Sequence, residues 1–123
     1  HHHDFEFVTL PDGKTPHEMI FKGAPLLDWE MDIAWVIRGG ADPIKLIKKY
    51  AGNITAAHIK DIAPKGKNAD EDGWADVGHG TVDWKPIMAA LKKTRVRHFV
   101  LEHDKPSNTK RFAERSFVAA SKL

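Results

Sequence analysis

Three short apolar segments of this chain each end in a side chain that could bind a metal ion. They end at Asp32, His58 and Glu102, and each is followed by loop residues and then by a helical pattern. Because the active site of a (β/α) barrel lies at the carboxyl ends of its strands, these side chains are expected to converge there. One imidazole and two carboxylates suit Mn²⁺, Mg²⁺, Co²⁺ or Zn²⁺. The pattern predicts a divalent metal site, and a buried network of ion pairs through Lys60 is the alternative.

Alternation along the strands separates polar from apolar side chains. Residues two apart in a strand share a face, so the polar residues of each segment lie together and the apolar residues between them lie opposite. The apolar faces are expected to pack against helices, and the polar faces to point into a barrel interior. The polar pairs are Glu30 with Asp32, His58 with Lys60, and Glu102 with Asp104.

A repeated strand–helix order is expected to position these residues. Strands are predicted at residues 26–33, 54–60 and 97–102, and residues 4–9 are interpreted as the end of an earlier strand. Helices are predicted at residues 16–22, from residue 43 up to Gly52, and at residues 84–93 and 109–122, with a long loop over residues 61–81. Four parallel strands, each followed by a helix, make an α/β fold. A (β/α)8 barrel takes about 250 residues, so this chain supplies half of one.

Composition sets further limits. The 123 residues include no cysteine, which excludes a disulfide scaffold and a thiolate metal site, and 41% of them are hydrophobic, which suits a packed core. No run of about 18 apolar residues is present, so no membrane partner is expected. Lys and Arg are scattered at a net charge of only +2, so no nucleic-acid partner is expected. The composition does not determine the cellular compartment, and the cytoplasm is favoured.

Five motifs resemble, in order, those of the sugar phosphate isomerase/epimerase group of xylose-isomerase-like TIM barrels. In one-letter code they are HHHDFEF at residues 1–7, EMDIAWVIRGGADP at 30–43, HIKD at 58–61, DVGHGTVDW at 76–84 and LEHD at 101–104. The resemblance covers nearly the whole chain but only the C-terminal half of the family's barrel. It implies one half-barrel domain over residues 1–123, comprising strand–helix units 5 to 8 without the N-terminal half.

The opening histidines have two interpretations. By composition His1, His2 and His3 could be the remnant of a purification tag. The resemblance instead implies that His1 and His3 are native and that the chain begins inside a strand, as a proteolytic product or a truncated form would.

The resemblance also implies a metal-dependent enzyme that acts on a keto-sugar or polyol through an enediolate. Family members hold the metal with side chains from four strands, and Asp32, His58 and Glu102 match three of these positions. The fourth position is commonly Glu, where this chain offers His3 or His1, with Glu6 as a further option.

The catalytic and substrate-binding residues follow from the same resemblance. Glu102 is the expected base, and Lys60 would hold substrate oxygens or donate a proton. The substrate contacts expected around the metal are His1, Trp35, Arg38, Lys60 and His79. A surface salt bridge is the alternative for Arg38, and a solvent-exposed loop position is the alternative for His79.

Two alternatives to an isomerase/epimerase remain open. Only one of the two bases that epimerases use has a match, so a lyase or dehydratase acting on a keto-sugar or inosose is one alternative. The other is a catalytically incomplete fragment. Open sheet edges would make such a fragment pair with the missing N-terminal half-barrel or with a second copy of itself.

Overall fold

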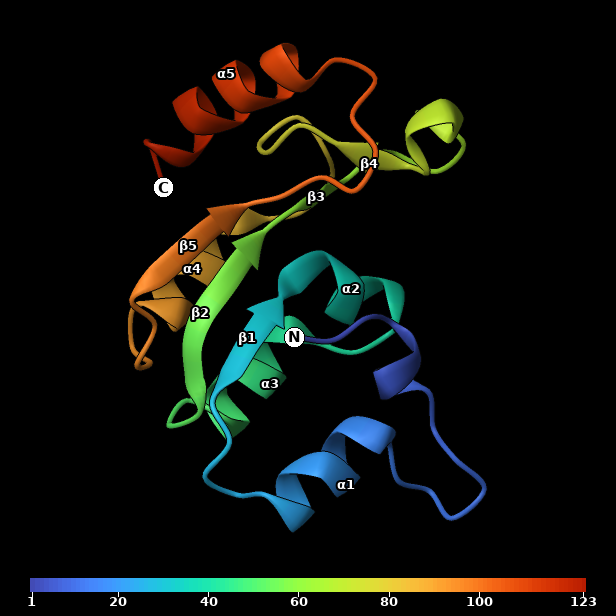
Figure 1. Ribbon diagram of the computed structural model, residues 1–123, viewed down its shortest axis with the longest axis vertical. Helices are drawn as coiled ribbons and strands as arrows, with labels where there is room; N and C mark the ends of the chain where they lie inside the picture. The colour runs from blue at the N-terminus through green and yellow to red at the C-terminus, as the bar shows by residue number, and fades with distance from the viewer.

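The computed structural model describes residues 1–123 and shows an α/β fold built on a parallel sheet (Figure 1). Its strands are β1 (Trp29–Asp32), β2 (Ile54–Ile59) and β5 (His98–Leu101), in the order β1-β2-β5. In the parallel register Asp32 lies opposite His58, and His58 lies opposite Val100. The predicted α/β class with a parallel sheet is confirmed.

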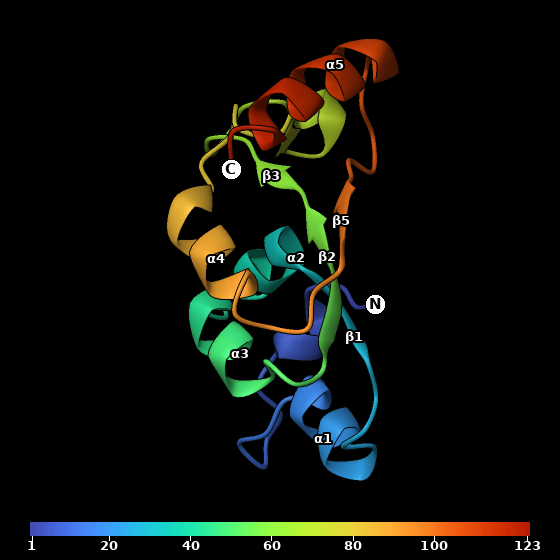
Figure 2. The same ribbon diagram turned by 90° about the vertical axis from the view of Figure 1, so that its left-hand side faces the viewer.

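Helices cover one face of this sheet and both ends of the molecule. Figure 2 shows α2, α3 and α4 on the same side of the sheet. In Figure 1, α1 lies toward the amino ends of the strands and α5 beyond their carboxyl ends. The helices are α1 (Pro16–Gly23), α2 (Ile33–Arg38), α3 (Pro43–Lys49), α4 (Trp84–Leu91) and α5 (Thr109–Ala120). None of them is both long and apolar enough to cross a bilayer.

Side-chain caps fix the starts of α1 and α3. Thr15 Oγ1 accepts a hydrogen bond from the Glu18 N–H at 3.2 Å, and Glu18 Oε2 accepts one from the Thr15 N–H at 3.3 Å. This reciprocal pair is a capping box at the start of α1. At the start of α3, Asp42 Oδ1 accepts from the N–H groups of Ile44 and Lys45.

The prediction of a strand end at residues 4–9 is wrong. Phe5–Phe7 forms a 3₁₀ helix, η1, closed by a hydrogen bond from the Phe7 N–H to the Asp4 carbonyl at 3.0 Å. The alternation of Phe5 with Phe7 suggested a strand, but only Phe7 is buried and Phe5 is 61% exposed. The sheet therefore has three parallel strands instead of the predicted four.

Four further elements were not predicted, one after β1 and three in the expected loop. Helix α2 begins directly after β1, because the Asp32 side chain caps it. The expected loop at 61–81 contains the antiparallel strands β3 (Asp61–Ile62) and β4 (Trp74–Ala75), with the 3₁₀ helix η2 (Ala69–Glu71) between them.

Asp61 holds this connection together. Its carboxylate is fully buried and accepts hydrogen bonds from the backbone N–H groups of Ile62, Gly78 and Val82 and from the Trp84 indole. A Cβ atom at Gly80 would come within 2.1 Å of Asp61 Oδ1, so only glycine allows the loop to approach this closely. Asp61 therefore serves the fold that carries the strand ends.

The core lies between the sheet and its helices. Met31, Ile33, Ala57 and Ile59 are all at most 2% exposed, so the apolar strand faces pack inward as predicted. At the edge strand β5, however, Phe99 remains 43% exposed.

Candidate metal and substrate site

Three potential metal ligands converge at the carboxyl ends of β1 and β2. Ligand atoms of His1, Asp32 and His58 all lie within 4.8 Å of one another. Asp32 Oδ2 is 3.4 Å from His58 Nδ1 and 3.7 Å from His1 Nε2. Glu102 follows β5, and its Oε2 lies 4.0 Å from His58 Nδ1. We call these four residues the strand-end cluster.

Only one oxygen of Asp32 is already in use. Oδ1 accepts a hydrogen bond from the Trp35 N–H at 2.9 Å, which caps α2. Oδ2 is buried and has no hydrogen-bond partner. Because a buried carboxylate oxygen without a partner is costly, this atom is suited to a cation.

His58 shows the same division between its two ring nitrogens. Nε2 is 2.7 Å from Glu30 Oε1, whereas Nδ1 is buried without a hydrogen-bond partner. Burial lowers the pKa of His58, but the carboxylates of Asp32 and Glu30 outweigh that effect and raise it overall above 6.5. A carboxylate on the far nitrogen is the usual support of a metal-binding histidine.

Lys60 ties Glu102 to a neighbouring carboxylate. Its Nζ lies 2.8 Å from Glu102 Oε2 and also pairs with Asp104. The Lys60 side chain is 0% exposed, whereas that of Glu102 is 25% exposed. Glu102 can therefore reach a substrate, and Lys60 is covered by its partners.

Aromatic rings form a wall beside Lys60. Its Nζ lies 3.9 Å from the ring centre of Trp74 and 4.6 Å from that of Trp35. Arg38 stacks on the Trp74 ring and donates to the Asp72 carbonyl at 2.6 Å. Burial lowers the pKa of the Arg38 guanidinium. Arg38 thus joins α2 to the connection that carries β4.

The donor set fits a divalent cation. Two buried atoms without partners, Asp32 Oδ2 and His58 Nδ1, face each other beside Glu102 and His1. Carboxylate oxygens with imidazole nitrogens suit Mn²⁺, Co²⁺ or Zn²⁺ in particular. These four residues could hold such an ion.

Two of the predicted site residues lie elsewhere. The His3 ring stacks on Phe5 and meets Trp35 edge-on at 5.2 Å, outside the group of ligand atoms. Of the two histidines expected as the fourth ligand, His1 lies within the group of ligand atoms and His3 does not. His79 is exposed and lines a separate pocket beside α5.

Three residues near the cluster were missing from the predicted site. Glu30 supports His58, Asp104 pairs with Lys60, and buried His2 accepts a hydrogen bond from the Asp32 N–H. The face-sharing rule pointed to Glu30 and Asp104. No sequence signal distinguished His2 from its neighbours.

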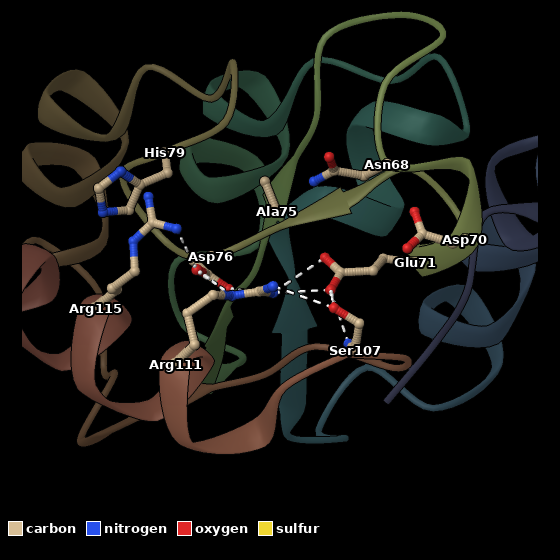
Figure 3. A pocket seen from close by; sticks show the side chains of 9 residues that line it. All are labelled: Asn68, Asp70, Glu71, Ala75, Asp76, His79, Ser107, Arg111 and Arg115. Carbon is tan, nitrogen blue, oxygen red and sulfur yellow. Dashed lines mark hydrogen bonds and ion pairs between the residues drawn. The ribbon is translucent and has the colours of Figure 1, made fainter.

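A second charged group lies beside α5, in the pocket of Figure 3. Arg111 bonds to both carboxylate oxygens of Glu71 and of Asp76. Arg115 Nη1 adds a contact of 3.0 Å to Asp76, and Ser107 donates to Glu71. The bonds from Ser107 and then Arg111 lower the pKa of Glu71 to about 2. We call these five residues the α5 network.

No model of a known protein family matches the chain, and no curated protein matches it in sequence. Two solved structures of a sugar phosphate isomerase/epimerase from Parabacteroides distasonis ATCC 8503 match its fold. One has a TM-score of 0.71 at 19% identity, over 97% of this chain and 41% of its own length. The other has a TM-score of 0.69 at 19% identity, over 98% of this chain and 42% of its own length.

The chain therefore spans about two fifths of the length of these structures, consistent with the C-terminal half that the motifs predict. At 19% sequence identity the structural similarity establishes the fold only. The predicted resemblance is therefore confirmed for the fold. The chain has the fold of part of a sugar phosphate isomerase/epimerase.

Proposed function

We propose that this chain carries the metal-binding and proton-transferring part of a sugar isomerase/epimerase. The observation that carries the proposal is the pair of buried, unpartnered atoms Asp32 Oδ2 and His58 Nδ1, which face each other beside the partly exposed Glu102. A divalent ion held by Asp32, His58, Glu102 and His1 would polarise a carbonyl oxygen of a keto-sugar and so acidify the adjacent C–H.

Glu102 is the proposed base. Its carboxylate would take the proton from the acidified carbon and return it to the neighbouring carbon, while the hydroxyl proton moves to the former carbonyl oxygen. Epimerisation at the same carbon would need a second proton donor on the opposite face of the sugar. Lys60 acts through Glu102, because its side chain is fully buried and its Nζ lies 2.8 Å from Glu102 Oε2. Trp35 and Trp74 surround this ammonium group and limit its contact with water.

A dehydratase would begin with the same proton removal. The reactions diverge only afterwards, when a hydroxyl on the next carbon leaves as water. The products therefore separate the two assignments, and the residues at the proton-removal step are shared.

Two measurements test the proposal. Titration with Co²⁺, followed by its visible absorption, is expected to show one ion per chain, with the site lost in His58→Ala. The Co²⁺-loaded chain in D₂O with a ketohexose is then followed by ¹H NMR. Loss of a substrate C–H signal shows the proton-removal step, new resonances of an isomeric sugar indicate isomerisation or epimerisation, and a dehydrated product indicates the lyase.

The controls use residues inside and outside the cluster. Glu102→Gln should stop the exchange, and His79→Ala should not, since His79 lies in the other pocket. The absence of Co²⁺ binding by the parent chain would refute the proposal.

A second candidate function, self-association, is favoured by the open edge of β5. This strand pairs only with β2, and Phe99 and Val100 on it are 43% and 37% exposed. An apolar groove beside it, lined by Phe99, Leu101 and Phe117 among others, has a volume of about 270 Å³. Parallel edges of this kind invite pairing.

The occupant we propose for this edge is a second copy of the chain. Two chains of 123 residues approach the length of a barrel, about 250 residues, and together supply six of its eight parallel strands. Sedimentation of the 13.8 kDa chain should therefore show a dimer, and Phe99→Lys should shift it toward the monomer. A monomer at all concentrations would exclude self-association.

A further inference from the structure

His2 is buried beside the strand-end cluster at 4% exposure. Its Nε2 accepts a hydrogen bond from the backbone N–H of Asp32 at 2.9 Å. Its Nδ1 lies 3.0 Å from the carbonyl oxygen of His3, to which it donates. The two contacts define one neutral tautomer, with the proton on Nδ1 and the lone pair on Nε2.

The Asp32 N–H has no strand to pair with on this side. Strand β1 lies at the edge of the sheet and pairs only with β2. A buried N–H without an acceptor is rare in folded proteins because it is costly. The His2 ring supplies the acceptor that a carbonyl of a neighbouring strand would otherwise supply.

This bond completes the fixation of Asp32. The backbone is held by His2, and Oδ1 is held by the Trp35 N–H at 2.9 Å. The remaining oxygen, Oδ2, then points toward His58 Nδ1 and His1 Nε2.

Packing keeps the His2 ring in place. Phe7 meets it edge-on at 4.9 Å between ring centres, and Trp29 lies at 5.4 Å. The ring is therefore fixed by two hydrogen bonds and by two aromatic neighbours.

We propose that His2 is a positioning residue, whose neutral imidazole holds the backbone of Asp32 so that Oδ2 is presented to the metal ion. The role in metal binding rests on the proposed function above. The hydrogen bond to Asp32 is independent of any ion.

Two substitutions at His2 separate the hydrogen bond from the packing. His2→Phe keeps an aromatic ring without an acceptor, and His2→Gln keeps an acceptor of similar reach. With Co²⁺ alone as the probe, His2→Phe should weaken binding about 10-fold, as expected for a supporting residue, and His2→Gln should bind close to the parent. The Asp32 amide should exchange its hydrogen faster in His2→Phe than in His2→Gln.

Equal Co²⁺ affinity and equally slow Asp32 exchange in both variants would overturn the proposal. If the parent binds no Co²⁺, the proposed function fails, and exchange at Asp32 alone then decides whether His2 holds it. If His2→Phe does not fold, the ¹⁵N shifts of His2 in the parent decide. A proton on Nε2 would overturn the hydrogen bond.

Discussion

The strand-end cluster and the α5 network both gather charged side chains beyond the carboxyl ends of the sheet. They differ in how many of their buried polar atoms have hydrogen-bond partners. In the α5 network every carboxylate oxygen of Glu71 and Asp76 has a partner. In the strand-end cluster Asp32 Oδ2 and His58 Nδ1 are buried without a hydrogen bond and lie 3.4 Å from each other.

This difference indicates which group serves the fold and which is open to a ligand. A fully matched network stabilises the contact between α5 and the rest of the chain, but it leaves little for a ligand to gain. Buried atoms without partners are exceptions in folded proteins and call for an explanation. A bound cation explains those of the strand-end cluster.

The largest expected effect comes from breaking the α5 network at its centre. Arg111→Leu leaves Glu71 and Asp76 buried without their main partner, and losing one side of a buried ion pair typically costs about 3–5 kcal/mol. Both carboxylates have side chains at most 5% exposed, so water cannot replace the guanidinium fully. Urea unfolding measures the loss.

Co²⁺ affinity is the companion measurement for Arg111→Leu. If the two groups have separate roles, the variant that still folds should bind the ion like the parent. A large loss of affinity at unchanged stability would erase the distinction between them.

Asp32→Asn is the reverse experiment. Asn keeps an oxygen to cap α2, so the loss of the cap itself should contribute less than about 0.5 kcal/mol to the free energy of unfolding. It removes the carboxylate charge, so Co²⁺ affinity should fall about 100-fold, or about 2.7 kcal/mol. Unchanged affinity would mean that Asp32 is not a ligand.

His17 tests whether unpartnered atoms alone make a site. Both of its ring nitrogens are buried without partners, but its neighbours are the rings of Phe21, Trp29 and Tyr50 instead of carboxylates. Burial is the main cause that lowers the pKa of His17 from 6.5 to about 4.

The sign of the pH dependence follows directly. Between pH 4 and 6.5 the unfolded chain binds a proton at His17 that the folded chain excludes, so stability falls as the pH drops through this window. Between pH 7 and pH 5 the loss should be about 2 kcal/mol, and His17→Leu should remove it. Urea unfolding at the two pH values, compared between parent and variant, isolates this residue from His58, whose raised pKa acts in the opposite direction.

An unchanged pH dependence in His17→Leu would mean that the imidazole is solvated in the folded chain. The expected result would show that a buried imidazole without hydrogen bonds, surrounded by aromatic rings, only destabilises the folded chain. An imidazole that faces a carboxylate is instead suited to binding a cation.

The strand-end cluster was predictable because few rules determine it. Parallel register brings the ends of neighbouring strands together, so Asp32, His58 and Glu102 could be predicted to converge from their positions alone. Side-chain capping likewise marked the starts of α1 and α3.

The remaining features depend on information that a local pattern does not hold. Phe5 and Phe7 alternate as in a strand, and only packing shows that the chain turns there. Only the tertiary structure likewise shows that His1 faces Asp32 while His3 faces Trp35. The α5 network joins residues 35 to 40 positions apart, which no spacing rule could connect.

The smallest expected effect sharpens the account of the α5 network. Arg115 contacts only one oxygen of Asp76, at 3.0 Å, and its side chain is 46% exposed. Because Arg111 already satisfies both oxygens of that carboxylate, Arg115→Met should cost only about 0.5 kcal/mol, as an exposed ion pair does. If urea unfolding instead shows a loss as large as that of Arg111→Leu, the network depends on its total charge and not on the matching of buried atoms. The contrast with the strand-end cluster would then need a different explanation.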